Sequence, residues 1–459
     1  MSDREPTARA EVITIETPGL GDRSYLVHDG SSALVVDPQR DIDRVLHLAE
    51  SLQVQVTHVL ETHLHNDYVT GGLALAEETG ARYVVPAGDA VEFERTPVGD
   101  GAELAAGSLT FVARHTPGHT PHHMAYVVRA GADPVAVFTG GSMLFGAVGR
   151  TDLIAKERTE ELTRAQFRSV RRLAHELPGH VAVHPTHGFG SFCSATETSG
   201  EASTIADERD RNIALVIDDE DRFVTELLGG LSAYPRYYAH MASANAKGPA
   251  APDLSPPEVI DPERLAQRLA AGEWVVDLRS RRAFARSHLA GTVSIELGDP
   301  FAVYLGWTLP WQAPITLVGD SIEQVGEARR QLVRIGFDAL TGAALGPPEA
   351  LGGELKGYPV ASFDDLALEP ERDDRIVLDV RREDEWSGGH LTGALHIPFF
   401  ELAERVGELP EREIWVHCKS GFRAAIATSL LDRAGLACVL IDDDWERADK
   451  LGLAITTAR

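Results

Sequence analysis

Cysteine is scarce in this chain of 459 residues, which holds only Cys193, Cys418 and Cys438. Three widely separated thiols form neither a disulfide framework nor a cysteine-based zinc knuckle. The sequence also has no apolar run long enough for a membrane helix, and its N-terminus has no basic region followed by an apolar stretch. We therefore expect a protein of the cytoplasm, without membrane association.

Basic residues are in short supply as well. The chain has 43 Lys and Arg against 70 Asp and Glu, a formal net charge of -27. This excess of negative charge opposes binding to nucleic acid and to anionic membranes. We therefore expect small-molecule substrates, and the length leaves room for about three domains.

The first half of the chain has many short apolar runs and few long amphipathic stretches. Residues 12–15, 24–27 and 33–36 predict strands separated by turns, whereas residues 41–51, 73–79 and 160–176 have helical periodicity. Many strands with a few helices are typical of a β-sandwich flanked by helices. The fold class expected for the whole chain is α/β and multidomain.

Three turns rich in histidine follow predicted strands. The first turn, residues 62–72, reads Thr-His-Leu-His-Asn-Asp-Tyr-Val-Thr-Gly-Gly. His63 and His65 lie two residues apart, so in an extended segment both side chains leave the same face, and Asp67 continues this alternation. The other two turns read His-Thr-Pro-Gly-His-Thr-Pro-His-His at 115–123 and Val-His-Pro-Thr-His-Gly at 183–188. Together the three turns predict a metal site.

These turns resemble the metallo-β-lactamase fold, an αββα sandwich, and the resemblance covers residues 1–242. Within that fold, Gly-Arg-Thr-Asp at 149–152 and Pro-Arg-Tyr-Tyr-Ala-His-Met at 235–241 look like the persulfide dioxygenases. The resemblance implies one Fe(II) held by two histidines and a carboxylate, with open positions for a thiolate and O2. It places the two histidines on His63 and His119.

The sequence departs from this family pattern at two positions. Gly141 stands where the family has the carboxylate, and Tyr68 stands where the pattern has histidine. Both changes remove ligands of a second metal, which argues against a two-zinc hydrolase. We expect one divalent metal, Fe(II) in preference to Zn(II), on three histidines: His63, His65 and His119. Asp67 and His187 are expected to orient water or substrate, or to form a weak second site. A metal-free relic remains an alternative.

A linker and an internal repeat follow the metal domain. Residues 243–257 are rich in Pro and Ala without apolar periodicity, which predicts a semi-rigid linker. Beyond it, Val-Val-Asp-Leu-Arg at 275–279 matches Val-Leu-Asp-Val-Arg at 377–381, and a His-x-x-Gly turn follows both at the same distance. The two copies, 258–350 and 358–459, each resemble a rhodanese domain, which implies a parallel sheet covered by helices. The first copy has Asp320 where the second has Cys418, so we expect it to be degenerate.

Cys418 lies between a predicted strand and a predicted helix. The unpaired N–H groups and the dipole of a helix N-terminus favour an anion, so a thiolate or persulfide would be stabilised there. The persulfide-binding loop is expected to comprise Lys419, Ser420, Gly421, Phe422 and Arg423. We expect Cys438, in an apolar strand, and Cys193 to have packing roles.

The combined resemblance implies a sulfur-metabolism enzyme. A persulfide of the glutathione persulfide class would be oxidised by O2 to sulfite in the metal domain, and Cys418 would transfer sulfur between thiol, sulfite and thiosulfate acceptors. Two alternatives remain open. The first is a metal-dependent thioester hydrolase of glyoxalase II type, and the second is a sulfurtransferase whose metal domain is not catalytic. A homo-oligomer is compatible with either.

Overall fold

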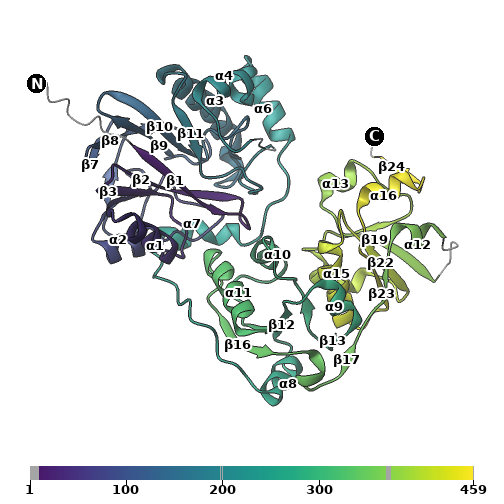
Figure 1. Ribbon diagram of the computed structural model, residues 1–459. Coiled ribbons are helices and arrows are strands. Elements are labelled where there is room, and N and C mark those ends of the chain that lie inside the picture. Colours follow the sequence, from purple (N-terminus) through teal and green to yellow (C-terminus); the bar gives the residue numbers. More distant parts are fainter. Residues whose placement is uncertain (1–9, 197, 199, 369–373, 458–459) are drawn as a thin grey trace, which may run out of the picture. The chain divides into compact units, whose positions relative to one another are not determined.

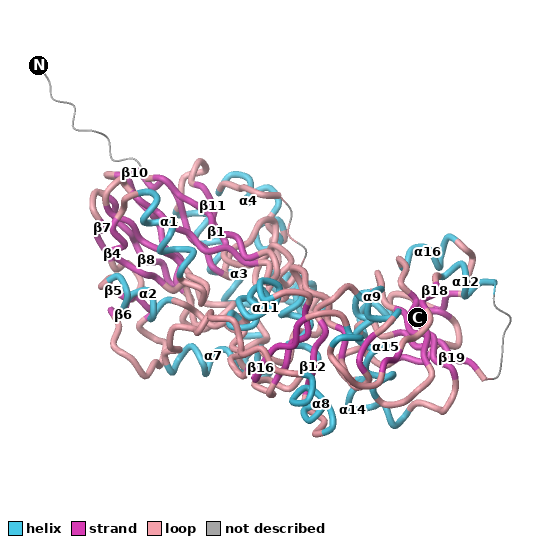
Figure 2. The backbone as a smooth tube through the Cα atoms, turned by 60° about the horizontal axis from the view of Figure 1, so that its bottom comes forward, coloured by secondary structure: helices cyan, strands magenta, loops and turns pink. Residues whose placement is uncertain are grey.

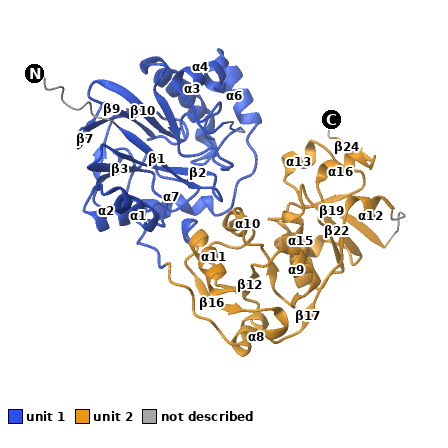
Figure 3. Cartoon of the chain, in the orientation of Figure 1, with its two compact units in different colours: residues 1–253, 333–336 blue, residues 254–332, 337–459 orange. Residues whose placement is uncertain are grey.

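A computed structural model describes residues 10–196, 198, 200–368 and 374–457 (Figure 1). The chain forms two compact units (Figure 3): unit 1 comprises residues 1–253 and 333–336, and unit 2 comprises residues 254–332 and 337–459. The division between residues 253 and 254 falls inside the stretch that the sequence predicts to be a linker. No helix of the described residues has the length and apolar character needed to cross a membrane.

Unit 1 contains two β-sheets. The first has the order β1-β2-β3-β4-β5-β6 and the second has the order β11-β10-β9-β8-β7. The strands of the first sheet are β1 (Glu11–Thr17), β2 (Asp22–His28), β3 (Ser32–Val36), β4 (Gln55–Leu60), β5 (Arg82–Pro86) and β6 (Thr96–Val98). Those of the second are β7 (Glu103–Ala106), β8 (Leu109–His115), β9 (Met124–Ala130), β10 (Asp133–Gly140) and β11 (Ala182–Pro185).

Alternation of side chains along the strands builds two cores at the first sheet. In β3, Leu34 and Val36 pack in the core shared with Phe111 and Phe138 of the second sheet. Ala33 and Val35 point to the opposite face and pack with helix residues. Both faces of the strand are therefore buried, because successive side chains leave a strand on opposite sides.

Helices cover the outer face of each sheet (Figure 1). α1 (Asp43–Leu52) and α2 (Gly72–Thr79) pack on the first sheet. On the second sheet, α3 (Thr159–Glu176) buries Phe167, Val170, Leu173 and Ala174, which share one face of the helix. The remaining helices of unit 1 are α4 (Ile205–Arg211), α5 (Ile213–Val216), α6 (Glu220–Gly229) and α7 (Tyr238–Lys247). The arrangement is the αββα sandwich that the sequence predicts.

Helix α7 differs from the sequence-based prediction. It continues to Lys247, so the first five residues of the predicted linker at 243–257 are helical. Apolar periodicity does not mark this end of the helix, because the polar side chain of Asn245 holds it in place. Asn245 is 1% exposed and forms hydrogen bonds with the loop that carries His63 and His65.

Short strands and short helices alternate in unit 2, in magenta and cyan in Figure 2. One sheet has the order β14-β12-β15-β16, built from β12 (Trp274–Asp277), β14 (Val293–Ser294), β15 (Ile315–Gly319) and β16 (Leu340–Leu345). The other has the order β18-β23-β22-β19-β21, built from β18 (Val360–Ala361), β19 (Arg375–Asp379), β21 (Leu395–His396), β22 (Glu413–His417) and β23 (Cys438–Ile441). The strand pairs in both sheets are parallel.

The helices described between residues 254 and 457 are α8 (Pro262–Ala270), α9 (Arg281–Arg286), α10 (Phe301–Thr308), α11 (Ile322–Arg334, whose last two residues belong to unit 1), α12 (Phe363–Leu368), α13 (Glu383–Ser387), α14 (Leu402–Arg405), α15 (Phe422–Arg433) and α16 (Trp445–Lys450). Two antiparallel pairs of short strands complete the unit: β13 (His288–Leu289) with β17 (Leu355–Lys356), and β20 (His390–Leu391) with β24 (Ile455–Thr456).

The internal repeat is visible in this topology. In chain order, β12, β14, β15 and β16 take the same relative places in their sheet as β19, β21, β22 and β23 do in theirs. The repeated side chains also make the same contacts, because Arg279 binds Asp277 and Arg381 binds Asp379, each with a shortest distance of 2.6 Å. The two sheets therefore share one strand order, and the division into two domains at 258–350 and 358–459 stays a prediction.

Candidate functional site

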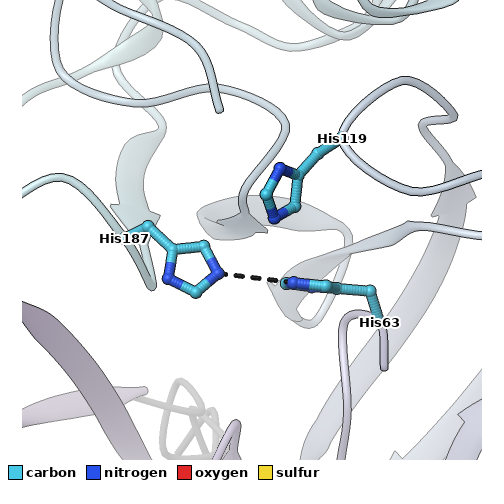
Figure 4. Close-up of side chains that lie close together, drawn as sticks. All are labelled: His63, His119 and His187. Atoms are coloured by element: carbon cyan, nitrogen blue, oxygen red, sulfur yellow. Dashed lines mark hydrogen bonds between the residues drawn. The ribbon is translucent and has the colours of Figure 1, made fainter. Parts of the chain in front are cut away.

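Three loops bring histidines together in unit 1. His63 follows β4, His119 follows β8 and His187 follows β11, and all three side chains are fully buried. One nitrogen of each residue lies within 4.8 Å of the nitrogens of the other two. Figure 4 shows the three rings converging, and His63 Nε2 lies 3.3 Å from His187 Nε2.

The partners of the Nδ1 atoms fix which nitrogen of each ring can bind a metal. The Nδ1–H of His119 donates to the carbonyl oxygen of Arg150 at 2.7 Å. The hydroxyl of Thr62 donates to Asp37, so it accepts the Nδ1–H of His63 at 2.8 Å. His187 Nδ1 lies 2.9 Å from Asp22 Oδ1 and 3.0 Å from Asp67 Oδ2. Each Nε2 therefore faces the shared centre, and acceptors on the Nδ1 side are typical of metal-bound histidine.

The protonation of two of the three histidines fits a metal centre directly. Burial lowers the pKa of His63 well below its usual value and that of His119 to about 3, so both rings are neutral and their Nε2 lone pairs are available. Burial alone would lower the pKa of His187, but Asp67 and Asp22 raise it well above its usual value, so an ion would displace a proton there. The Nε2 of His119 is buried and has no hydrogen-bond partner among the described residues. A divalent cation at this point would supply the missing partner, so the donor set fits a resident metal.

His65 is placed differently from the sequence-based expectation, which grouped it with His63 and His119. Its Nε2 lies 3.3 Å from Asp37 Oδ1, 3.2 Å from Glu61 Oε2 and 2.9 Å from the Tyr68 hydroxyl. Burial alone would lower the pKa of His65, but Asp37 and Glu61 raise it to about 9. Three partners thus engage the Nε2 of His65, which lies outside the group formed by His63, His119 and His187. By distance, His187 lies in the place that we expected for His65, and the choice of metal ligands stays a prediction.

Asp67 and His187, which we expected to support the metal ligands, bind each other: Asp67 Oδ2 lies 3.0 Å from His187 Nδ1. His65, Asp67 and His187 form a second group of potential ligands, which shares His187 with the first. Because Asp67 holds the Nδ1 side of His187, only the Nε2 remains for an ion. A third group, Asp37, Glu61 and His65, shares no residue with the first, so the number of bound ions stays a prediction.

Two residues that shape the site, Gln166 and Asn245, are not predicted by the sequence. Gln166, buried on α3, accepts from the His119 backbone N–H at 2.8 Å and donates to the Gly141 carbonyl at 3.2 Å. Asn245 donates to the carbonyls of His65 and Tyr68, both at 2.9 Å, and accepts from the Thr70 N–H. Both side chains lie far along the sequence from the histidines that they support, so no local pattern reveals them.

Replacement of Asn245 by alanine is expected to weaken metal binding by about 10–100-fold, because the loop carrying His63 would lose its anchor. It would also leave two carbonyls and one N–H buried without a partner, which costs about 1–3 kcal/mol or more. Metal competition titration and thermal melting measure the two effects. Ser243→Ala, an exposed change in the same helix, is the control. Equal metal affinity in both variants would contradict this role of Asn245.

Cys418 lies where the sequence predicts, between β22 and α15. The residue is 1% exposed, and the loop after it reaches the helix through Gly421, whose φ of +85° favours glycine. A Cβ on Gly421 would lie 3.1 Å from the Asp442 Cα and closer still to its carboxylate. Lys419 and Ser420 are exposed. The loop therefore turns tightly around the cysteine at the N-terminus of a helix of 12 residues.

Arg423 is a buried cation of this loop, and its guanidinium binds the carboxylate of Glu385 at 2.5 and 2.8 Å. Burial alone would lower the pKa of Arg423, but the hydrogen bonds to Glu385 and the negative charge at Cys418 and Glu385 raise it. The positive charge therefore stays beside Cys418, where it favours an anionic sulfur.

Substitution of Glu385 by glutamine is expected to destabilise unit 2 by about 1.5–3 kcal/mol at pH 7, since Arg423 loses a charged partner. Burial raises the pKa of Glu385, but the bonds from Arg423 lower it from 4.5 to about 2. The stabilisation of unit 2 by the Glu385–Arg423 ion pair is therefore full above pH 4.5 and is lost as the pH falls towards 2. Urea unfolding across this range, with the exposed Glu383→Gln as control, measures it. A stability difference that does not change with pH would contradict the assignment.

The first repeat contacts the Cys418 loop and its surroundings. Asp442, which lies against Gly421, binds Arg281 at 2.7 Å and Arg282 at 2.5 Å. The ring of Tyr304 lies 5.1 Å from that of Phe422. At Asp320, the exposed position that matches Cys418, the chain has no thiol. The first repeat therefore supports the second but cannot carry sulfur at this position.

Comparison with known proteins gives the family of this fold. The sequence model of the metallo-beta-lactamase superfamily matches residues 18–173. Hydroxyacylglutathione hydrolase from Pseudomonas paraeruginosa is 32% identical over 201 residues, which are 41% of this chain and 74% of that protein. The chain belongs to the metallo-β-lactamase superfamily. The mitochondrial persulfide dioxygenase ETHE1 of Homo sapiens is 27% identical over 213 residues, 46% of this chain and 76% of that protein.

A second family model, that of the rhodanese-like domain, matches residues 362–448. The chain is thus a metallo-β-lactamase-fold protein with a C-terminal rhodanese domain, as the sequence predicts. A rhodanese assignment for the first repeat stays a prediction. Among solved structures, a metallo-beta-lactamase from Staphylococcus aureus is similar, with a TM-score of 0.66 and 26% identity, covering 73% of this chain and 99% of that one.

Proposed function

We propose that this protein oxidises a low-molecular-weight persulfide, of the glutathione persulfide class, to sulfite and transfers sulfane sulfur through Cys418. The observation that carries the proposal is the convergence of three Nε2 atoms, from His63, His119 and His187, in one buried centre. The overall oxidation would be R–S–SH + O2 + H2O → R–SH + SO3²⁻ + 2 H⁺. The similarity to persulfide dioxygenase ETHE1 supports this choice.

The proposed metal is one Fe(II), held by His63, His119 and His187. When bound, it would supply open coordination positions and redox chemistry with O2, whereas Zn(II) fits the same ligands without redox activity. The chain's own contribution is orientation. Arg150, Thr62 and the pair Asp22 and Asp67 hold the three Nδ1 atoms, so each Nε2 faces the same point before an ion arrives.

Sulfur transfer at Cys418 would run through a covalent persulfide. The thiolate attacks the outer sulfur of thiosulfate, the S–S bond of the donor breaks, and sulfite leaves with the bonding electron pair. A thiol or sulfite then takes the outer sulfur, and the Cys418 thiolate returns. The helix N-terminus and Arg423 stabilise the negative charge on the added sulfur. Sulfite, the product of the proposed oxidation, is thus an acceptor for the second site.

Oxygen uptake tests the first activity. Protein reconstituted anaerobically with Fe(II) is given glutathione persulfide, and O2 consumption and sulfite are measured together. Stoichiometric sulfite formation that requires Fe(II) would support the dioxygenase. No uptake by fully loaded protein, with Cys418-dependent sulfur transfer intact, would instead assign the activity to the rhodanese domain alone.

A thioester hydrolase is the second candidate, because hydroxyacylglutathione hydrolase is among the similar proteins. The site argues against it. Tyr68, hydrogen-bonded to His65, stands where the family pattern has a histidine, and Gly141 supplies no carboxylate, so a second metal would lack two of its usual ligands. Hydrolysis of a glutathione thioester by the Zn(II)-loaded protein, faster than persulfide oxidation by the Fe(II)-loaded protein, would favour the hydrolase.

A further inference from the structure

The ring of His119 lies in a slot between two glycines. A Cβ on Gly141 would be 2.6 Å from His119 Cγ and 2.7 Å from its Nε2. A Cβ on Gly149 would be 2.8 Å from His119 Nδ1 and 3.1 Å from its Cγ. Carbon and nitrogen atoms that are not bonded do not approach so closely, so neither position accepts a larger residue while the ring stays in place.

Hydrogen bonds hold the two glycines and the backbone of His119 in place around this slot. The Gly149 N–H donates to the Gly141 carbonyl at 3.0 Å, which ties the two glycines together. Gln166 binds both the Gly141 carbonyl and the backbone N–H of His119. The Gly141 N–H in turn donates to His123 Nε2 at 3.1 Å. A Cβ at position 141 could therefore not be relieved by a small movement of this turn, and the His119 ring would have to move instead.

We infer that Gly141 is a building element of a three-histidine metal site and not the trace of a lost ligand. This inference rests on the proposed single-metal centre. The dioxygenases that the chain resembles have a carboxylate ligand at this turn. In this chain the residue is Gly141, and the His119 ring lies in the space that a side chain would fill. His187 supplies the third donor from another loop.

The position of His187 supports this exchange of ligands. Its Nε2 lies 3.3 Å from that of His63, and its Nδ1 is held between Asp22 and Asp67. Two acidic residues would thus influence a bound metal through this imidazole. In place of a carboxylate bound directly to the metal, Asp22 and Asp67 would act on it through the hydrogen bonds that they form with His187. Restoring an aspartate at position 141 would displace His119 without adding a donor to the existing trio.

Metal binding by Gly141 variants of the full chain tests the inference. Co(II) affinity is measured by competition and its coordination by visible absorption, without any activity assay. Gly141→Ala, which removes no ligand, is expected to weaken Co(II) binding by at least about tenfold, and Gly141→Asp is expected not to strengthen it. Gly99→Ala is the control, because a Cβ there meets nothing within 4 Å. Wild-type affinity and spectrum in Gly141→Ala, or tighter binding in Gly141→Asp, would overturn the inference.

His187→Ala provides a second test if a variant at position 141 fails to fold, which circular dichroism would reveal. It is expected to lose Co(II) affinity by at least about tenfold and to change the absorption bands, since the trio loses a donor. Undiminished affinity would show that His187 is no ligand and would overturn the inference. The proposed oxidation fails separately, if the metal-loaded wild type consumes no O2 with glutathione persulfide.

Discussion

His119→Ala is expected to lower persulfide-dependent oxygen uptake by more than about 100-fold, because loss of outer partners of a metal ligand alone costs about 10–100-fold. The side chain is fully buried, and its Nε2 faces the other two histidines without another partner among the described residues. Its removal leaves two imidazoles, too few to hold a divalent cation firmly in competition with water. Metal content after gel filtration and the rate of O2 consumption measure the two losses.

A histidine of the same turn offers a matched control. His122 lies three residues further along and is exposed, so His122→Ala changes the same residue type without touching the centre. Uptake in this variant should equal that of the wild type. If both substitutions lowered the rate equally, the turn as a whole would matter and the role of His119 as a ligand would be refuted. Sulfur transfer by Cys418 should remain in both.

Local sequence patterns predict the elements of the sandwich well. The strand around 33–36 and the helix at 160–176 can be predicted from periodicity alone, because the buried faces require apolar residues at regular spacing in the sequence. The end of α7 could not be predicted this way. Asn245 is buried for its hydrogen bonds, and its partners lie in a loop distant in sequence.

The metal site shows the same limit. His63 and His119 are proposed from the motif and lie together in the structure, whereas the positions of His65 and His187 depend on carboxylates contributed by other segments. Glu61 and Asp37 bind the Nε2 of His65. Asp22 and Asp67 bind the Nδ1 of His187, which leaves its Nε2 facing the other two histidines. Spacing within one loop cannot encode these contacts. The substitution at Gly141 likewise looks like a loss in the sequence, and only the position of the His119 ring gives it a structural role.

Cys418→Ser is expected to lower thiosulfate-dependent sulfur transfer by about three orders of magnitude or more, as loss of a covalent nucleophile generally does. The hydroxyl keeps the size of the thiol but cannot form a persulfide, so the helix N-terminus and Arg423 have no sulfur to stabilise. Transfer of sulfur from thiosulfate to a thiol measures this loss, and mass spectrometry detects the added sulfur on Cys418 of the wild type.

Cys438→Ser is the control for this substitution, because Cys438 is a buried cysteine of β23 in the same sheet and its Sγ lies 3.7 Å from the Thr428 carbonyl. It should keep its transfer activity. Oxygen uptake at the metal centre should also persist in Cys418→Ser, since its proposed ligands all belong to unit 1. If Cys418→Ser also stopped oxygen uptake, the persulfide oxidised at the metal would have to come from Cys418 itself and not from a free small molecule.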